Sequence, residues 1–279
     1  MKYVFFGTPN FAARVLDGLI NGGNPPSVLV CNPDKPVGRK KIITPPPTKQ
    51  LILNREVPMK IFQPGSVKEL SDLSDELFRE CDFGVVAAYG QIIPRKVIDS
   101  ARLGIIGVHP SILPKLRGAS PIQGAILEGY EETGVSLFML DEEVDHGPVL
   151  VQREISVGDY NYAKLEKRLA DVGVELLINT LPRFVTEKTE LAAQNESEAT
   201  YTAKYSASDG YVEPDELKTA ETNGASAVNI SRKIRALNPE PGVYTVIDGK
   251  RTKLLGAELI DGKLKLTEIQ KEGGLPRKL

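Results

Sequence analysis

The sequence contains two histidines, His109 and His146, and each stands after an apolar run that is typical of a strand. An imidazole titrates near neutral pH, and a carboxylate beside it can hold its tautomer and stabilise its charged form. The turn before His146 holds several carboxylates, Asp145 among them, that could supply this partner. Either histidine, together with one of these carboxylates, could therefore form a site that moves a proton to or from a carbonyl or an amine. The same residues also fit a histidine packed at a strand end and a solvated acidic turn.

Two other kinds of chemistry are less favoured by the residues around these histidines. Ser111 lies close to His109, but the Gly-x-Ser-x-Gly turn of serine hydrolases is missing. The two histidines and two cysteines lack the spacing of a metal site, so no metal is expected. The acidic turn before His146 adds three candidate carboxylates, Asp141, Glu142 and Glu143.

The elements that must position these side chains alternate between strands and helices. Apolar runs predict strands at 3–6, 27–31, 60–63, 83–88, 104–109, 135–140 and 149–157, and helical spacing predicts helices between them, including 67–78 and 118–127. This order predicts an α/β fold, a Rossmann-like, mostly parallel sheet with helices on both faces. His109 then lies at the carboxyl end of a strand, where open α/β sheets bind ligands. The single Gly7 gives no dinucleotide fingerprint.

The second half of the chain changes character. Residues 190–208 are small and polar, which predicts a linker between a catalytic domain at 1–189 and a second domain at 209–279. A helix is expected near 226–237, followed by short strands. The pairs at 248–249 and 261–262 are both Asp-Gly, a strong hairpin signal. The second domain is therefore expected to be small and mostly β.

Residues 32–50 are rich in proline and hold five basic residues without an acid between Lys35 and Lys49. We expect an exposed loop that neither pairs into a sheet nor continues a helix. The loop could be a solvated excursion, or a finger that contacts phosphates through Arg39, Lys40 and Lys41.

The composition limits the kinds of partner that the protein could bind. The 279 residues include 35 basic and 37 acidic ones, so a nucleic acid would have to bind a local patch. No stretch is long enough to span a membrane, and the start does not resemble a signal peptide. Two cysteines make no disulfide framework, which favours a reducing cytoplasm.

Six segments together resemble one family: residues 6–9, 32–41, 87–94, 108–123, 133–136 and 144–148. In this order they resemble the methionyl-tRNA formyltransferases, along nearly the whole chain. The resemblance implies a Rossmann-like domain that uses 10-formyltetrahydrofolate, and a C-terminal OB-like β-barrel, here shortened, that contacts the tRNA. It implies methionyl-initiator-tRNA as the acceptor. We expect no metal, no membrane partner and a cytoplasmic monomer.

The resemblance also assigns roles residue by residue. His109 would polarise the formyl carbonyl, and Asp145 would position that histidine and serve the proton transfer. The basic loop with Arg39, Lys40 and Lys41 would enter the acceptor stem. Folate would be held by two groups of residues: Ala88, Tyr89, Gly90, Gln91 and Ile92 in one segment, and Ser111, Leu113, Pro114, Asp141 and Glu142 in the others.

One position departs from the family pattern, which has Asn-Val-His where this chain has Gly107 before Val108 and His109. Losing one donor to a developing oxyanion typically costs ~10²–10³ in rate. We expect Gly107→Asn to raise the rate of formyl transfer. Two alternatives stay open: an amino-sugar nucleotide formyltransferase, and a weakly active or non-catalytic member that binds tRNA or folate.

Overall fold

The computed structural model describes residues 1–38, 40–187 and 189–279, and these form two compact units. Each unit is assembled from three stretches that alternate along the chain. The first unit comprises Met1–Arg117, Gly134–Glu154 and Glu166–Thr200, and the second comprises Gly118–Thr133, Ile155–Leu165 and Tyr201–Leu279. The predicted domain boundaries at 189 and 209 stay a prediction.

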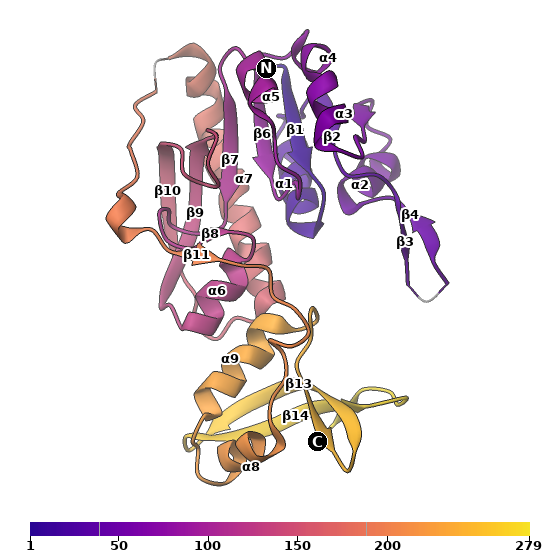
Figure 1. Cartoon of the computed structure of the whole chain (residues 1–279). Coiled ribbons are helices and arrows are strands. Elements are labelled where there is room, and N and C mark those ends of the chain that lie inside the picture. The colour runs from indigo at the N-terminus through magenta and orange to yellow at the C-terminus, as the bar shows by residue number, and fades with distance from the viewer. Residues whose placement is uncertain (39, 188) are drawn as a thin grey trace. The chain divides into compact units, whose positions relative to one another are not determined.

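The main sheet has seven strands in the order β10-β9-β7-β6-β1-β2-β5 (Figure 1). Strands β5, β2, β1, β6 and β7 pair in parallel, and β9 runs antiparallel to β7. The apolar runs form this sheet because a strand covered on both faces excludes water from all its side chains. The α/β class and the mostly parallel sheet are confirmed. The strands are β1 (Tyr3–Gly7), β2 (Val28–Val30), β5 (Lys60–Phe62), β6 (Phe83–Ala87), β7 (Ile105–His109), β9 (Glu132–Met139) and β10 (Val149–Ser156).

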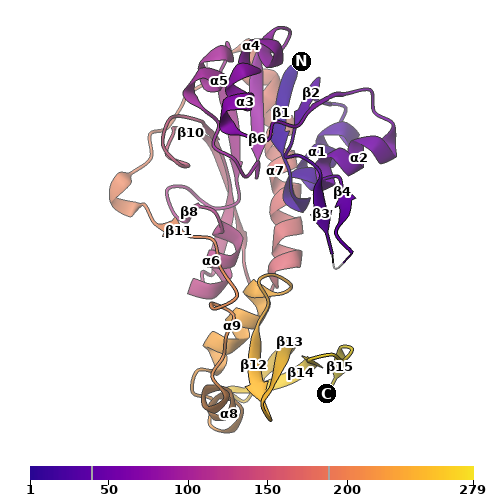
Figure 2. The ribbon, with the colours of Figure 1, turned by 45° about the vertical axis from the view of Figure 1, so that its right-hand side comes forward.

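Helices cover both faces of the sheet (Figure 2). On one face, Leu70, Leu77 and Val97 join a buried cluster with alternate residues of the central strands. On the other, the ring of Phe184 meets that of Phe83 edge-on, with centroids 5.6 Å apart. The helices of this unit are α1 (Asn10–Asn21), α2 (Pro47–Arg55), α3 (Val67–Asp72), α4 (Ser74–Phe78), α5 (Arg95–Ser100) and, from Glu166 onward, α7 (Tyr162–Thr186).

The single helix predicted over 67–78 is wrong, because the structure has two helices that part at Leu73. Ser66 caps the first helix, its side chain accepting a hydrogen bond from the Glu69 amide. The break does not interrupt the apolar face, since Leu70 and Leu77 are both buried in the same cluster. The periodicity therefore located the buried face, and it missed the break.

The proline-rich segment also differs from its prediction, because part of it pairs into a sheet. Strands β3 (Lys35–Val37) and β4 (Ile42–Thr44) form an antiparallel hairpin in which Pro36 stands opposite Ile43. Only alternate residues of such a pair direct their amides at the partner, so a proline is tolerated where its nitrogen faces outward. The expectation of an exposed segment holds, since Val37 is 56% and Ile42 61% exposed.

The second unit contains a four-stranded antiparallel sheet in the order β12-β13-β14-β15, where an OB-like barrel was expected. The Asp-Gly pairs at 248–249 and 261–262 join consecutive strands, and all four residues have positive φ, as a type I′ hairpin turn requires. Both predicted hairpins are confirmed. The strands are β12 (Tyr244–Ile247), β13 (Lys250–Ile260), β14 (Lys263–Lys271) and β15 (Arg277–Lys278).

Three helices belong to the second unit, α6 (Pro121–Glu128), α8 (Pro214–Thr222) and α9 (Ala227–Leu237). α9 matches the helix expected near 226–237. α8 was not predicted, because in its polar sequence only Leu217 and Ala220 are buried. Two further short strands, β8 (Arg117–Gly118) and β11 (Tyr201–Thr202), pair with each other, and a 3₁₀ turn covers Glu196–Glu198. None of the helices in the described ranges is long and apolar enough to cross a membrane.

Candidate active site

His109 is the last residue of β7 and lies at the carboxyl edge of the sheet, as predicted. Its side chain is buried, and its two ring nitrogens face different partners. Nε2 lies 2.9 Å from the carbonyl oxygen of Leu116, and Nδ1 lies 3.6 Å from a carboxylate oxygen of Asp145. A carbonyl oxygen only accepts, so Nε2 is the nitrogen that donates there, and Nδ1 faces the Asp145 carboxylate. The structure thus brings the predicted pair together.

The turn that carries Asp145 is held by backbone contacts. Asp145 has φ 52°, in the left-handed region that non-glycine residues rarely adopt. Gly147 comes so close to the end of β9 that a Cβ there would lie 1.9 Å from the carbonyl oxygen of Met139. The Asp-His-Gly-Pro sequence therefore has a structural reason, since only glycine fits at its third position.

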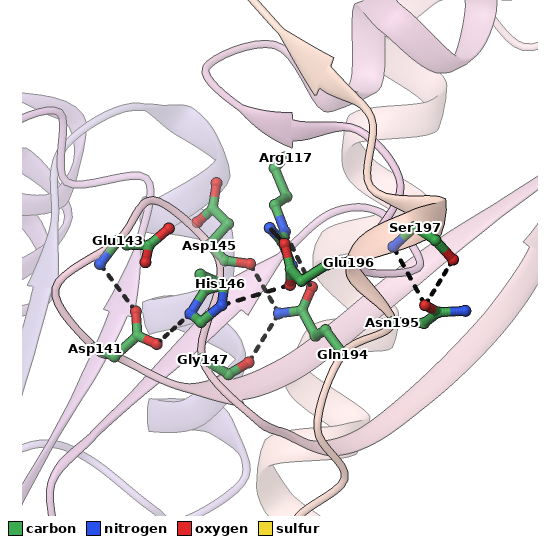
Figure 3. A network of polar contacts seen from close by, with 10 residues as sticks. All are labelled: Arg117, Asp141, Glu143, Asp145, His146, Gly147, Gln194, Asn195, Glu196 and Ser197. Carbon is green, nitrogen blue, oxygen red and sulfur yellow. Dashed lines mark hydrogen bonds and ion pairs between the residues drawn. The ribbon is translucent and has the colours of Figure 1, made fainter.

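A buried arginine and two residues from the predicted linker form a polar network beside this turn (Figure 3). Arg117 is completely buried, and its guanidinium donates hydrogen bonds to the side chains of Gln194 and Glu196. The Gln194 amide in turn donates to the carbonyl oxygens of Asp145 and Gly147, each at 2.8 Å. The sequence did not predict this network. Arg117 lies within the 108–123 segment that resembles the family, but nothing in the polar 190–208 stretch indicated a partner for it.

His146 lies in the same turn but is not part of the pair formed by His109 and Asp145. Its Nδ1 lies 2.6 Å from Asp141 Oδ2, and its Nε2 lies 3.5 Å from Glu196. The hydrogen bond with Asp141, and then the nearby charges of Asp141, Glu143 and Glu196, raise the pKa of His146 above its ordinary value despite some desolvation. Arg117 lowers the pKa of Glu196. The contacts of this turn therefore favour the charged form of His146 and the charged form of Glu196.

Gly107, where the family pattern has asparagine, faces an aromatic ring. It pairs with Phe138 across β7 and β9, and a Cβ at residue 107 would lie 2.1 Å from Phe138 Cε1. Phe138 is 4% exposed and meets the His109 ring edge-on. The expectation that Gly107→Asn alone raises the rate is therefore not supported, since that change must first displace a buried ring.

The segments expected to hold folate follow β6, β7 and β9. After β6, Ala88 and Gly90 have positive φ and are exposed, while Tyr89 is buried between them. Ile92 is 74% exposed. Arg95, from the start of α5, forms an ion pair with Glu142 at 2.8 Å, which ties this segment to the acidic turn.

The other predicted folate residues have mainly internal partners. Ser111 is buried and donates to the carbonyl oxygen of Lys115, and Leu113 is also buried. Gln91 donates to Asn32 and to the carbonyl oxygen of Pro64. Asp141 accepts from His146 and the Glu143 amide. Pro114 follows Leu113 through a cis peptide bond.

Two of the three predicted basic residues, Lys40 and Lys41, fall on the turn of the β3–β4 hairpin. Lys40 and Lys41 are exposed there, and the Lys41 amide donates to the Gly38 carbonyl. Arg39 lies outside the described residues.

Comparison with known proteins identifies the family. The formyl transferase model matches residues 1–181, and the model of the formyl transferase C-terminal domain matches residues 224–275. The chain belongs to the formyl transferase family. It is 38% identical to a methionyl-tRNA formyltransferase from Methylococcus capsulatus over 262 residues, which cover 94% of this chain and 82% of that protein.

Solved structures share the fold of this formyltransferase. The methionyl-tRNA formyltransferase of Clostridium thermocellum superposes with a TM-score of 0.58 at 15% identity, covering 97% of this chain and 98% of that one. HypX from Aquifex aeolicus, solved with tetrahydrofolic acid, gives a TM-score of 0.67 at 16% identity, covering all of this chain and 46% of that one.

Proposed function

We propose that this formyltransferase moves the formyl group of 10-formyltetrahydrofolate to the α-amino group of methionyl-initiator-tRNA. The observation that carries the proposal is the position of the buried His109 at the carboxyl end of β7, with Asp145 3.6 Å from its Nδ1. Formyl transfer breaks one C–N bond and forms another, so a proton must leave the attacking amine and another must reach the departing nitrogen. An imidazole beside a carboxylate suits both needs.

Folate, when bound, supplies a formyl carbonyl that an amine can attack. The residues after β6 fit such a group, because Ala88 and Gly90 leave backbone exposed and Ile92 offers an exposed apolar side chain. Val144, 65% exposed in the acidic turn, offers a second apolar side chain. A flat pterin is bound by this combination of apolar contact and backbone hydrogen-bonding groups.

The two residues at the sheet edge divide the chemistry. His109, in its charged form, stabilises the negative charge that develops on the formyl oxygen during attack. Asp145 stabilises that charged imidazole, accepts the proton that the methionyl amine loses, and returns a proton to the departing nitrogen. Lys40 and Lys41 contact acceptor-stem phosphates from the exposed hairpin turn, and the 209–279 domain adds tRNA contacts. We propose that the protein acts as a cytoplasmic monomer.

A single assay tests this function. The purified protein is incubated with 10-formyltetrahydrofolate and either methionyl-initiator-tRNA or an amino-sugar nucleotide, and the formylated product of each is measured. We expect product with the tRNA only, and none from His109→Gln. Product with the sugar nucleotide alone would reassign the acceptor. Salt-sensitive tRNA binding without any product would favour the non-catalytic alternative.

A further inference from the structure

Gln194 reaches the catalytic turn from a distant part of the chain. Its amide nitrogen donates to two backbone oxygens, those of Asp145 and Gly147, which lie 49 and 47 residues earlier in the sequence. These two oxygens flank His146, so the two bonds span the turn (Figure 3). Both bonds act on the backbone that aims the Asp145 side chain.

Arg117 fixes which end of the Gln194 amide faces the turn. A guanidinium has donors and no acceptor, so it must meet the amide oxygen. Two of its nitrogens do so, at 3.1 and 2.8 Å. The Gln194 nitrogen is thereby directed at the carbonyls of the turn. Glu196 supplies the charge that a buried guanidinium needs, with contacts of 2.9 and 2.6 Å.

We propose, on the basis of the formyl transfer proposed above, that Gln194 is the positioning residue for Asp145 and that Arg117 orients it. Asp145 holds a left-handed backbone conformation, with φ 52°, which persists when surrounding contacts determine it. The two bonds from Gln194 are such contacts. They keep the carboxylate facing Nδ1 of His109, and the 194–196 segment is therefore a working part of the catalytic unit.

Two substitutions separate this role from a general loss of packing. Gln194→Glu keeps an oxygen for Arg117 but has no donor for the two carbonyls, and Gln194→Ala removes both contacts without adding charge. We expect each variant to lower kcat about 10- to 100-fold, because small misplacement of a catalytic group has effects of this size. The KM for methionyl-tRNA should stay unchanged. Gln270→Ala is the matched control, since Gln270 makes a comparable amide-to-carbonyl bond with Gly274.

The two histidines provide a readout that does not need activity. A spectrum of histidine ring nitrogens contains signals from His109 and His146 only, and His146→Gln assigns them. We expect the His109 signals to move in both Gln194 variants and to stay in place in Gln270→Ala, with thermal unfolding confirming that each variant folds. Wild-type kcat and wild-type His109 signals in folded Gln194→Ala would overturn the proposal, as would a loss confined to Gln194→Glu. If the wild type forms no formylmethionyl-tRNA while the ring signals still move, the proposed function fails and the positioning role stands.

Discussion

At the scale of single residues, the catalytic pair depends on which nitrogen of His109 faces which oxygen. The Leu116 carbonyl holds Nε2, so the ring cannot rotate freely, and Nδ1 stays beside Asp145. A neutral amide at residue 145 would keep most of the shape and lose the negative charge that stabilises a charged imidazole.

We therefore expect Asp145→Asn to lower kcat for formyl transfer by ~10²–10⁴, the usual contribution of a positioned acid or base. Steady-state kinetics with methionyl-tRNA measure the loss, and Glu80→Gln, an exposed carboxylate that pairs with Lys2, is the control. Retention of wild-type kcat by Asp145→Asn would remove this residue from the proton transfer.

A second residue-scale prediction concerns Gly107 and Phe138, because the Phe138 ring fills the space that a side chain at residue 107 would need. Gly107→Asn alone should lower both the melting temperature and the activity, because the new side chain collides with a buried ring. In Phe138→Ala, adding Gly107→Asn should instead raise kcat relative to Phe138→Ala alone, since an amide donor then fits beside His109. Thermal unfolding and the four-variant comparison of kcat decide it. Equal kcat in Phe138→Ala with and without Gly107→Asn would show that the site needs no donor there.

At the scale of elements, the charged groups of the acidic turn stabilise the fold by an amount that depends on pH. The raised pKa of His146 means that its charged form stabilises the fold. This contribution is complete below the unfolded pKa of about 6.5 and is lost as pH rises through the folded value. The lowered pKa of Glu196 has the opposite sense, with stability lost as pH falls.

We accordingly expect the melting temperature of the wild type to fall between about pH 6 and pH 9 more than that of His146→Gln. Thermal unfolding in buffers of constant ionic strength measures the difference. Parallel curves for the two proteins over this range would mean that the His146 charge does not stabilise the turn.

The β3–β4 hairpin presents its lysines on an exposed turn, as binding to a phosphate requires. Removing one lysine–phosphate interaction should lower the slope of log affinity against log salt by about 0.9. The variant Lys40→Ala/Lys41→Ala should therefore bind methionyl-tRNA more weakly and with a shallower slope. Lys68→Ala, an exposed lysine on α3, is the control, and an unchanged slope in the double variant would exclude the hairpin lysines from phosphate binding.

Elements differed in how far the sequence predicted them. The Asp-Gly hairpins and the β1 and β6 strands follow from local patterns, and so does the position of His109 at the end of β7. The pairing of Pro36 was missed because a general rule against proline in sheets was applied to a two-stranded hairpin. The Arg117 contacts join residues 77 and 79 positions apart, and no local pattern encodes such a distance. Local physics thus predicted where the site lies, and long-range packing determined what holds it.

At the scale of the whole molecule, each unit has its own core. Leu254 is fully buried in β13 of the second unit, and Leu259 on the same strand is 44% exposed. Leu254→Ala should lower the free energy of unfolding by about 2–5 kcal/mol, and Leu259→Ala much less. Denaturant unfolding measures both, and binding of folate should persist in both. An equal, small effect of the two changes would mean that the C-terminal sheet contributes no core of its own.

The first unit takes its three stretches from positions separated along the chain, and this fixes an order of events during synthesis. The turn with Asp145 leaves the ribosome 49 residues before the Gln194 that holds it. At ~5–20 residues per second, that interval is roughly 2 to 10 s. During this time β7, β9 and His109 already exist in the nascent chain, but the carbonyls of the turn lack the amide that binds them in the finished protein. Activity is therefore expected to arise late in translation, when the chain has passed Glu196.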